Sequence, residues 1–138
     1  MRTIRRKIRQ ESKVVAEPGL PQMGPGHYLQ YLPVLHAEIE PEVYLEVGTE
    51  SGASLSFSRA TSIAVDPAFK IDPQAFAGKS QIYLFQQKSD DFFASDIMGR
   101  LGHKVDLAFL DGMHLFEYLL RDFINTERLM NRDGVIAM

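Results

Sequence analysis

Residues 44–55 read YLEVGTESGASL, and this stretch indicates the fold of the chain. An apolar run ends in Glu46, and Gly48, Glu50 and Gly52 follow within the next six residues. Such a run is typical of a buried strand that turns sharply at the sheet edge where α/β proteins bind nucleotides. A dinucleotide turn carries G-x-G-x-x-G, because its backbone must approach a pyrophosphate. Glu50 stands where the second glycine would be. The stretch therefore predicts a turn of the nucleotide-binding type whose ligand is not a dinucleotide.

Apolar runs alternate with helical patterns along the rest of the chain. Strands are expected at 43–47, 62–66, 81–85, 105–110 and 134–138. Helices are expected at about 27–38, from Gly52 onward, at 89–102 and at 114–130, with a short helix at most at 73–77. Pro33 would lie inside the first helix and could kink it or shift its start. The alternation predicts βαβ units, and therefore an α/β fold with a parallel sheet and right-handed crossovers.

Two of these helices carry further signals. The segment 89–102 opens with Ser and Asp residues that can cap a helix and closes with Gly102. The segment 114–130 places apolar side chains on one helical face, namely Leu115, Phe116, Leu119, Leu120, Phe123 and Ile124. That periodicity makes it the best defined helix of the chain.

Acidic, polar and glycine residues stand at the ends of four consecutive predicted strands. They are Glu46, Gly48, Glu50 and Gly52 at the first strand, Asp66 at the second, Ser89 and Asp90 past the third, and Asp111, Gly112 and His114 at the fourth. Any one of them could simply cap a helix. In an open parallel sheet, however, ligands bind outside the carboxyl ends of the strands, where these residues would meet. Four acidic strand ends together favour a binding edge.

The acidic edge restricts the ligand. A carboxylate at Glu50 would lie at a helix start and repel a pyrophosphate bound there. A cationic or zwitterionic ligand with a ribose and no phosphate suits the edge better, and S-adenosylmethionine has these properties. Asp66 follows Glu46 by 20 residues, a spacing that suits hydrogen bonds to ribose hydroxyls but is shared by NAD sites.

The motifs resemble those of class I S-adenosylmethionine-dependent methyltransferases, in the branch with an E-x-G-x-x-x-G first motif. The resemblance covers about residues 42–138 through YLEVGTESGAS, IAVDP, KSDDFF and VDLAFLDGMHLFEYLL. It implies a Rossmann-like doubly wound sheet with strand order 3-2-1-4-5 and S-adenosylmethionine as cofactor. Glu46, Gly48, Glu50 and Gly52 would hold the methionine moiety, Asp66 the ribose, Ser89 and Asp90 the adenine side, and Asp111, with His114 nearby, would face the methyl group.

The chain also departs from that family. Asp133 and Gly134 stand where the family has Gly-Gly, and the sequence stops at the fifth strand, so strands 6 and 7 are expected to be lacking. Some relatives bind a divalent cation through later acids, and a complete metal site is therefore not expected. Asp111 or His114 could act as a general base. His114 could equally be a first-turn helix residue that bonds a nearby loop.

Three functions stay open at this stage. The first is S-adenosylmethionine-dependent methyl transfer, with O-methylation of a small hydroxylated or sugar-like acceptor. The second is a degenerate module that binds S-adenosylmethionine or S-adenosylhomocysteine without turnover. The third is an NAD-dependent oxidoreductase, which Glu50 disfavours.

Composition and charge set the remaining expectations. The 138 residues predict one methyltransferase-like domain at 27–138 after a basic arm and Pro/Gly linker at 1–26. Residues 1–13 hold six basic side chains and one acidic, whereas the remainder holds nine basic and seventeen acidic. The arm is expected to be solvated rather than to bind nucleic acid. Without cysteine or a long apolar segment, a cytoplasmic protein without a membrane span is expected. The edge at 134–138 is expected to form a homo-oligomer that buries Val135 and Ile136.

Overall fold

The computed structural model describes residues 28–138, and the predicted basic arm and linker at 1–26 lie outside them. Five strands form one sheet: β1 (Val43–Val47), β2 (Thr61–Val65), β3 (Ile82–Phe85), β4 (Val105–Leu110) and β5 (Met130–Ala137). All neighbouring strands are parallel, in the order β3-β2-β1-β4-β5. The predicted α/β fold and strand order are confirmed.

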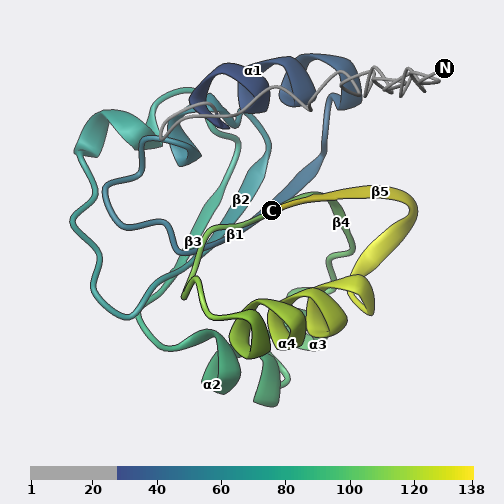
Figure 1. Ribbon diagram of the computed structural model, residues 1–138. Coiled ribbons are helices and arrows are strands. Elements are labelled where there is room, and N and C mark those ends of the chain that lie inside the picture. Colours follow the sequence, from purple (N-terminus) through teal and green to yellow (C-terminus); the bar gives the residue numbers. More distant parts are fainter. Residues whose placement is uncertain (1–27) are drawn as a thin grey trace, which may run out of the picture.

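Helices cover both faces of the sheet, as Figure 1 shows. On one face lie α1 (Tyr28–Ile39) and the two 3₁₀ helices η1 (Leu55–Phe57) and η2 (Pro73–Phe76). On the other face lie α2 (Ser89–Ala94), α3 (Ile97–Leu101) and α4 (Phe116–Glu127). The arrangement is a Rossmann-like doubly wound fold. No helix within residues 28–138 is long and apolar enough to cross a membrane.

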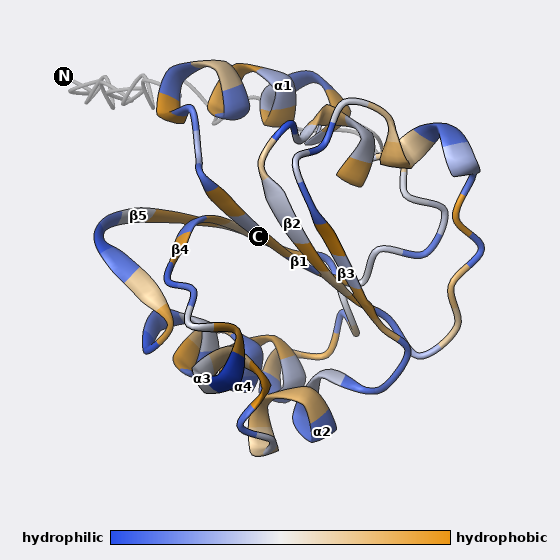
Figure 2. Cartoon of the chain, turned by 180° about the vertical axis from the view of Figure 1, so that it is seen from behind, coloured by the Kyte–Doolittle hydropathy of each residue, from blue (hydrophilic) through white to orange (hydrophobic). Residues whose placement is uncertain are grey.

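The central strands are apolar because both of their faces are covered (Figure 2). Side chains of β1 alternate between two cores. Leu45 joins Phe92 and Met98 in the core beneath α2, α3 and α4, whereas Tyr44 joins Leu32 and others in the core beneath α1. Because β1 pairs in parallel with β2 and β4, the three strands end at the same carboxyl edge of the sheet.

The helix expected from Gly52 onward is wrong in extent, because only the 3₁₀ turn η1 forms there. The segment is rich in serine, whose hydroxyl competes for backbone groups that a helix would use. The Ser56 hydroxyl donates to the Ala53 carbonyl at 2.6 Å, and the Ser58 hydroxyl accepts from the Ala60 amide at 3.2 Å. Local side-chain bonds therefore replace an α-helical ladder.

The single helix predicted at 89–102 is also corrected, since α2 and α3 are separate. Ser95 adopts an extended conformation, with ψ of 161°, and its hydroxyl donates to the Phe92 carbonyl at 2.6 Å. Lys88, rather than Ser89 or Asp90, occupies the cap position, and no side chain there caps the helix. Gly102 ends α3 in the left-handed region, as predicted.

The apolar face of α4 points largely to solvent. Phe116 is 79% exposed, and Leu115, Leu120, Phe123 and Ile124 are exposed as well. The buried residues of the helix are instead Asp122 and Thr126, while Leu119 packs partly against the core. The helix exists as predicted, but its inward side is partly polar.

Strand β5 begins at Met130 rather than at the predicted Gly134. Met130 pairs with Val105, and the register then shifts before Val135 pairs with Leu107. Glycine at 134 fits because a Cβ there would press on the Val105 carbonyl. The strand lies at the edge of the sheet formed by residues 28–138.

Candidate functional site

A cavity of about 480 Å³ opens at the carboxyl ends of the strands. Seven of the nine predicted site residues line it: Gly48, Glu50, Asp66, Ser89, Asp90, Asp111 and His114. The remaining wall consists of Val47, Val65, Pro67, Lys88, Gly112, Met113 and Tyr118. Glu46 and Gly52 are not among the lining residues. The parallel sheet thus brings together predicted residues that are up to 66 positions apart in the sequence, from Gly48 to His114.

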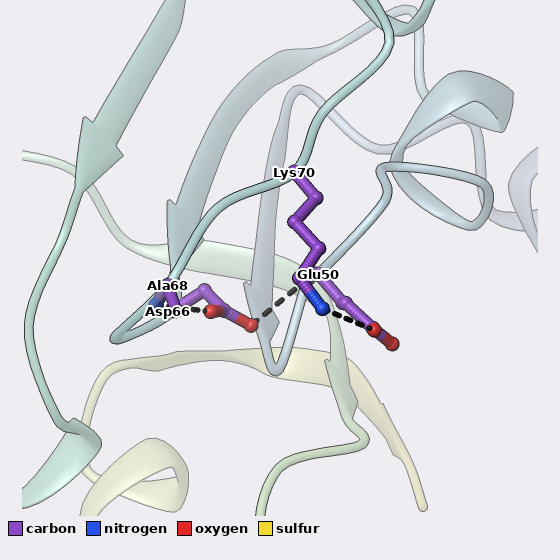
Figure 3. A network of polar contacts seen from close by, with 4 residues as sticks. All are labelled: Glu50, Asp66, Ala68 and Lys70. Carbon is purple, nitrogen blue, oxygen red and sulfur yellow. Dashed lines mark hydrogen bonds and ion pairs between the residues drawn. The ribbon is translucent and has the colours of Figure 1, made fainter.

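Asp66 organises the turn after β1 (Figure 3). One carboxylate oxygen accepts the Glu50 amide at 2.9 Å, and the other accepts the Ala68 amide at 2.7 Å. Each carboxylate oxygen has a second lone pair, so both can still accept a bond from a ligand. The buried side chain therefore holds two loops and presents acceptors at the cavity wall.

Glu50 has a left-handed backbone conformation, with φ of 42°. This conformation is uncommon for a residue other than glycine and costs about 1–2 kcal/mol. The bond to Asp66 and the bond from the Lys70 amide to the Glu50 carbonyl, 2.8 Å long, hold the residue there. Its exposed carboxylate forms an ion pair with Lys70 at 3.6 Å (Figure 3). The carboxylate therefore does not lie at a helix start, because no α-helix begins at this turn.

Gly48 lies where two loops cross. Its φ is +87°, and a Cβ would overlap the backbone of Asp111 and Gly112. The Asp111 amide in turn donates to the Val47 carbonyl at 2.8 Å. Glycine is thus required for the close approach that places Asp111 in the cavity wall. Gly52 has a different role, because a Cβ there would meet Ile71 and Ala75 rather than the cavity.

Glu46 is fully buried beneath the turn. The Tyr44 hydroxyl donates to its Oε2 at 2.6 Å, while Oε1 has no hydrogen-bond partner among the described residues. Burial raises the pKa of Glu46 to about 7, against the lowering effect of Tyr44 and the nearby Ser54 and Thr49 hydroxyls. Glu46 supports the turn from below and does not reach the cavity.

Asp111 and His114 both line the cavity, just after the end of β4. His114 Nε2 lies 3.6 Å from Asp111 Oδ1, and the imidazole is 83% exposed. Burial raises the pKa of Asp111, the adjacent His114 lowers it, and Glu50 raises it. The pair is placed to accept or hold a proton beside a bound ligand.

The wall that contains Asp90 of α2 and Tyr118 of α4 is held together by Arg121. Asp90 Oδ2 lies 3.3 Å from the Arg121 guanidinium, which also stacks over the Tyr118 ring at 4.6 Å. Behind this wall Asp122 is only 3% exposed, and burial raises the pKa of its carboxyl group. Asp90 is therefore held by a partner from another helix.

Sequence reasoning missed Tyr28, Tyr118 and Asp122. The Tyr28 ring stacks on Phe109 at 5.5 Å, and its pKa is raised by burial and then by Asp111, Glu46 and Glu50. Tyr118 follows the D-G-M-H segment by four residues, so its helical spacing from His114 could have indicated it. Asp122 could have been noticed as an acid inside an apolar helix. Tyr28 had no such signal, because only the fold brings it to this edge.

Within residues 28–138 no three His, Asp or Glu side chains are grouped so as to hold a metal ion. The acidic groups of the cavity instead contact backbone amides, Lys70, Arg121 or His114. Polar recognition of an organic ligand fits this arrangement better than metal coordination.

Solved structures with the same fold are known. The chain is similar to cofactor-bound Rv0187 from MTB, with 17% identity, a TM-score of 0.63, and coverage of 85% of this chain and 56% of that one. SAH-bound methyltransferase PaMTH1 from Podospora anserina gives 14% identity, a TM-score of 0.52, and coverage of 83% and 52%. An O-methyltransferase candidate from Klebsiella pneumoniae gives 14%, 0.56, and coverage of 85% and 56%.

The chain spans just over half the length of these structures. At these identities the likeness shows the shared fold. No protein-family model matches the sequence, and no curated protein matches it closely enough to count as a relative.

Proposed function

We propose that the chain binds S-adenosylmethionine and serves methyl transfer to a small hydroxylated acceptor. The observation that carries this proposal is the acceptor-rich cavity at the carboxyl edge, in which Asp66, Asp90 and Asp111 converge from three different strand ends. A cavity of about 480 Å³ is within the range of cofactor sites. The cofactor-bound and SAH-bound structures of the same fold support the proposal.

The residues present fit the proposed cofactor. The free lone pairs of Asp66 suit the ribose hydroxyls, and the acceptors at Ser89 and Asp90 suit an amino group of adenine. Glu50 and Asp111 supply negative charge for the α-amino and sulfonium groups. Glu46 would act indirectly, by supporting the turn, because it does not line the cavity.

A dinucleotide is less well suited to this cavity. A pyrophosphate needs the N-terminus of a helix directly after the first strand. Residues 52–58 form only a short 3₁₀ turn, and acidic side chains line the cavity beside it. The oxidoreductase alternative is therefore not favoured.

When bound, the cofactor supplies an activated methyl group. The chain would contribute mainly by positioning, since displacement of a methyl group requires donor and acceptor in line. Asp111 can accept the proton of an acceptor hydroxyl, and His114 can take it on from there, because the two side chains are 3.6 Å apart. The bond from the Asp111 amide to Val47 keeps this carboxylate at the cavity wall.

Calorimetry with S-adenosylhomocysteine and with NAD tests the binding part of the proposal. S-adenosylhomocysteine should bind, and Glu50→Lys should weaken it by reversing the charge of the wall. Asp91→Lys is a matched control, because Asp91 is exposed on α2 and does not line the cavity. Binding of NAD but not S-adenosylhomocysteine would reverse the assignment.

Methyl transfer from labelled cofactor to small phenols and sugars tests the catalytic part. Asp111→Asn should reduce the rate far more than cofactor affinity, and His114→Ala should reduce it by about 100-fold if His114 takes the proton. Binding without turnover under all conditions would favour a non-catalytic cofactor-binding module, which is the second candidate.

A further inference from the structure

Helix α4 carries an exposed apolar surface that the proposed function leaves unexplained. Six side chains form this surface, called the α4 stripe: Met113, Leu115, Phe116, Leu120, Phe123 and Ile124. The last four recur at helical spacing within α4, and the first two directly precede the helix. All six are between 37% and 79% exposed. The buried side of α4 is formed by Asp122 and Thr126 instead, so the stripe faces away from the core.

The stripe is large for the surface of a monomer. A large apolar side chain has about 200 Å² of surface, so six of them at roughly half exposure present on the order of 600 Å². Monomeric proteins rarely leave a contiguous apolar patch of more than a few hundred Å² in solvent. A standard protein interface buries about 800 Å² per partner, of which somewhat over half is apolar. The stripe therefore provides the apolar area that a stable dimer needs.

The charges beside the stripe identify the partner. Glu117 and Arg128 are both exposed, and neither forms an ion pair within residues 28–138. Arg128 continues the helical conformation at the cap position, with φ of −66° and ψ of −21°. The two residues are 11 positions apart, which is about three helical turns, so they lie on the same side of α4 at opposite ends. When two such helices pair antiparallel about a two-fold axis, Glu117 of each copy faces Arg128 of the other.

A parallel pair fits these charges less well. Equivalent residues then lie at the same height, so Glu117 would meet the same glutamate of the second copy, and Arg128 the same arginine. Like charges that face each other across an interface weaken it. Glu127 is the one charged residue of α4 that falls within the stripe, and its position in the last turn lets its carboxylate remain in solvent. The antiparallel arrangement is therefore favoured.

We propose that two copies of this chain associate through the α4 stripe, with their α4 helices antiparallel about a two-fold axis. Leu120, Phe123 and Ile124 lie at the centre of this interface, and the two reciprocal ion pairs lie at its rim. Met113 lies at one end of the stripe and also lines the cavity, so the second copy borders the cavity mouth. The open edge of β5 is a separate surface, and association through the stripe requires no bound cofactor.

Sedimentation velocity at micromolar concentration tests this interface. Val135→Lys serves as the starting chain, because it removes any contribution from the edge of β5, and it should sediment as a dimer. Adding Leu120→Lys should raise the dissociation constant at least about 30-fold, because a cation would then lie at the interface centre. Phe76→Lys is the matched control and should leave the dimer unchanged, since Phe76 is also exposed but lies on η2, on the opposite face of the sheet. Circular dichroism checks that each variant is folded, and Phe123→Lys replaces Leu120→Lys if that chain unfolds.

Charge reversal tests the antiparallel arrangement in the same Val135→Lys chain. Arg128→Glu should weaken the dimer about 10-fold, because it sets carboxylates against each other at both ends of the interface. Adding Glu117→Arg should restore the dimer, since the reversed charges pair again. A monomer throughout the micromolar range, or a dimer that Leu120→Lys leaves unchanged, would overturn the proposed interface. Failure of the double reversal to restore a dimer that Arg128→Glu has weakened would refute the antiparallel pairing.

Discussion

Replacing Asp66 with alanine should destabilise the turn that shapes the cavity. Asp66 is 7% exposed, and its two carboxylate oxygens accept the amides of Glu50 and Ala68 at 2.9 and 2.7 Å. Alanine leaves both donors without these acceptors, and an unpaired buried donor costs about 1–3 kcal/mol. Water can reach the partly buried amides, so we expect a loss of about 2–4 kcal/mol in the free energy of unfolding.

Asp72→Ala is the matched control for this substitution. The exposed Asp72 side chain accepts only the Gln74 amide, at 2.9 Å, as the cap of η2. Loss of one exposed cap should cost about 1 kcal/mol. Urea denaturation followed by circular dichroism measures both values, provided that the slope with denaturant is the same in each variant. Asp66→Asn should lie between the two, because its amide oxygen can accept one backbone amide.

Equal stability of Asp66→Ala and Asp72→Ala would refute the reasoning. It would mean that the amides of Glu50 and Ala68 are satisfied without Asp66. Any loss of cofactor affinity in Asp66→Ala would then come from direct contact with the ligand alone. A large loss of stability would instead require that affinity be compared at a temperature where the variant is folded.

Three further predictions concern the turn, the buried acid and the open edge. Gly48→Ala should lower the free energy of unfolding by about 2 kcal/mol or more and displace Asp111, which calorimetry and S-adenosylhomocysteine titration would detect. Glu46 has a pKa of about 7 when folded and 4.5 ordinarily, so its contribution to stability is fully present below pH 4.5 and is lost as pH rises to 7, by about 3 kcal/mol. Glu46→Gln should remove that pH dependence of urea midpoints. The exposed Val135 on edge strand β5 should take part in self-association, so light scattering should report a smaller species for Val135→Lys, and an unchanged size would argue against an interface there.

Much of the fold could be predicted because strands and turns carry local signals. The prediction for β4 agrees with the structure at both ends, since VDLAFL is apolar apart from Asp106 and lies between polar segments. The boundaries of the helices were less predictable. Serine bonds at Ser56 and Ser95 ended or shortened helices whose periodicity looked continuous.

The candidate site could be predicted in part for a similar reason. Asp66 and Asp111 directly follow apolar strands, and parallel strands bring their carboxyl ends together. Glu46 instead lies inside β1, and the alternation of side chains along the strand places it on the same face as Tyr44, in the core beneath α1. Whether Glu46 reaches the cavity depends on which face of the sheet its side chain occupies. The sequence alone does not determine that face.

The sequence by itself determined which segments form strands and which polar residues end them, because both depend on neighbouring residues in the chain. Tertiary structure decided which side chains face one another. Tyr28 stacks on Phe109 only because α1 packs beside β4, and Arg121 meets Asp90 only because α4 packs beside α2. Contacts between residues far apart in sequence depend on the packing of whole elements, and that packing sets the polarity of the cavity wall.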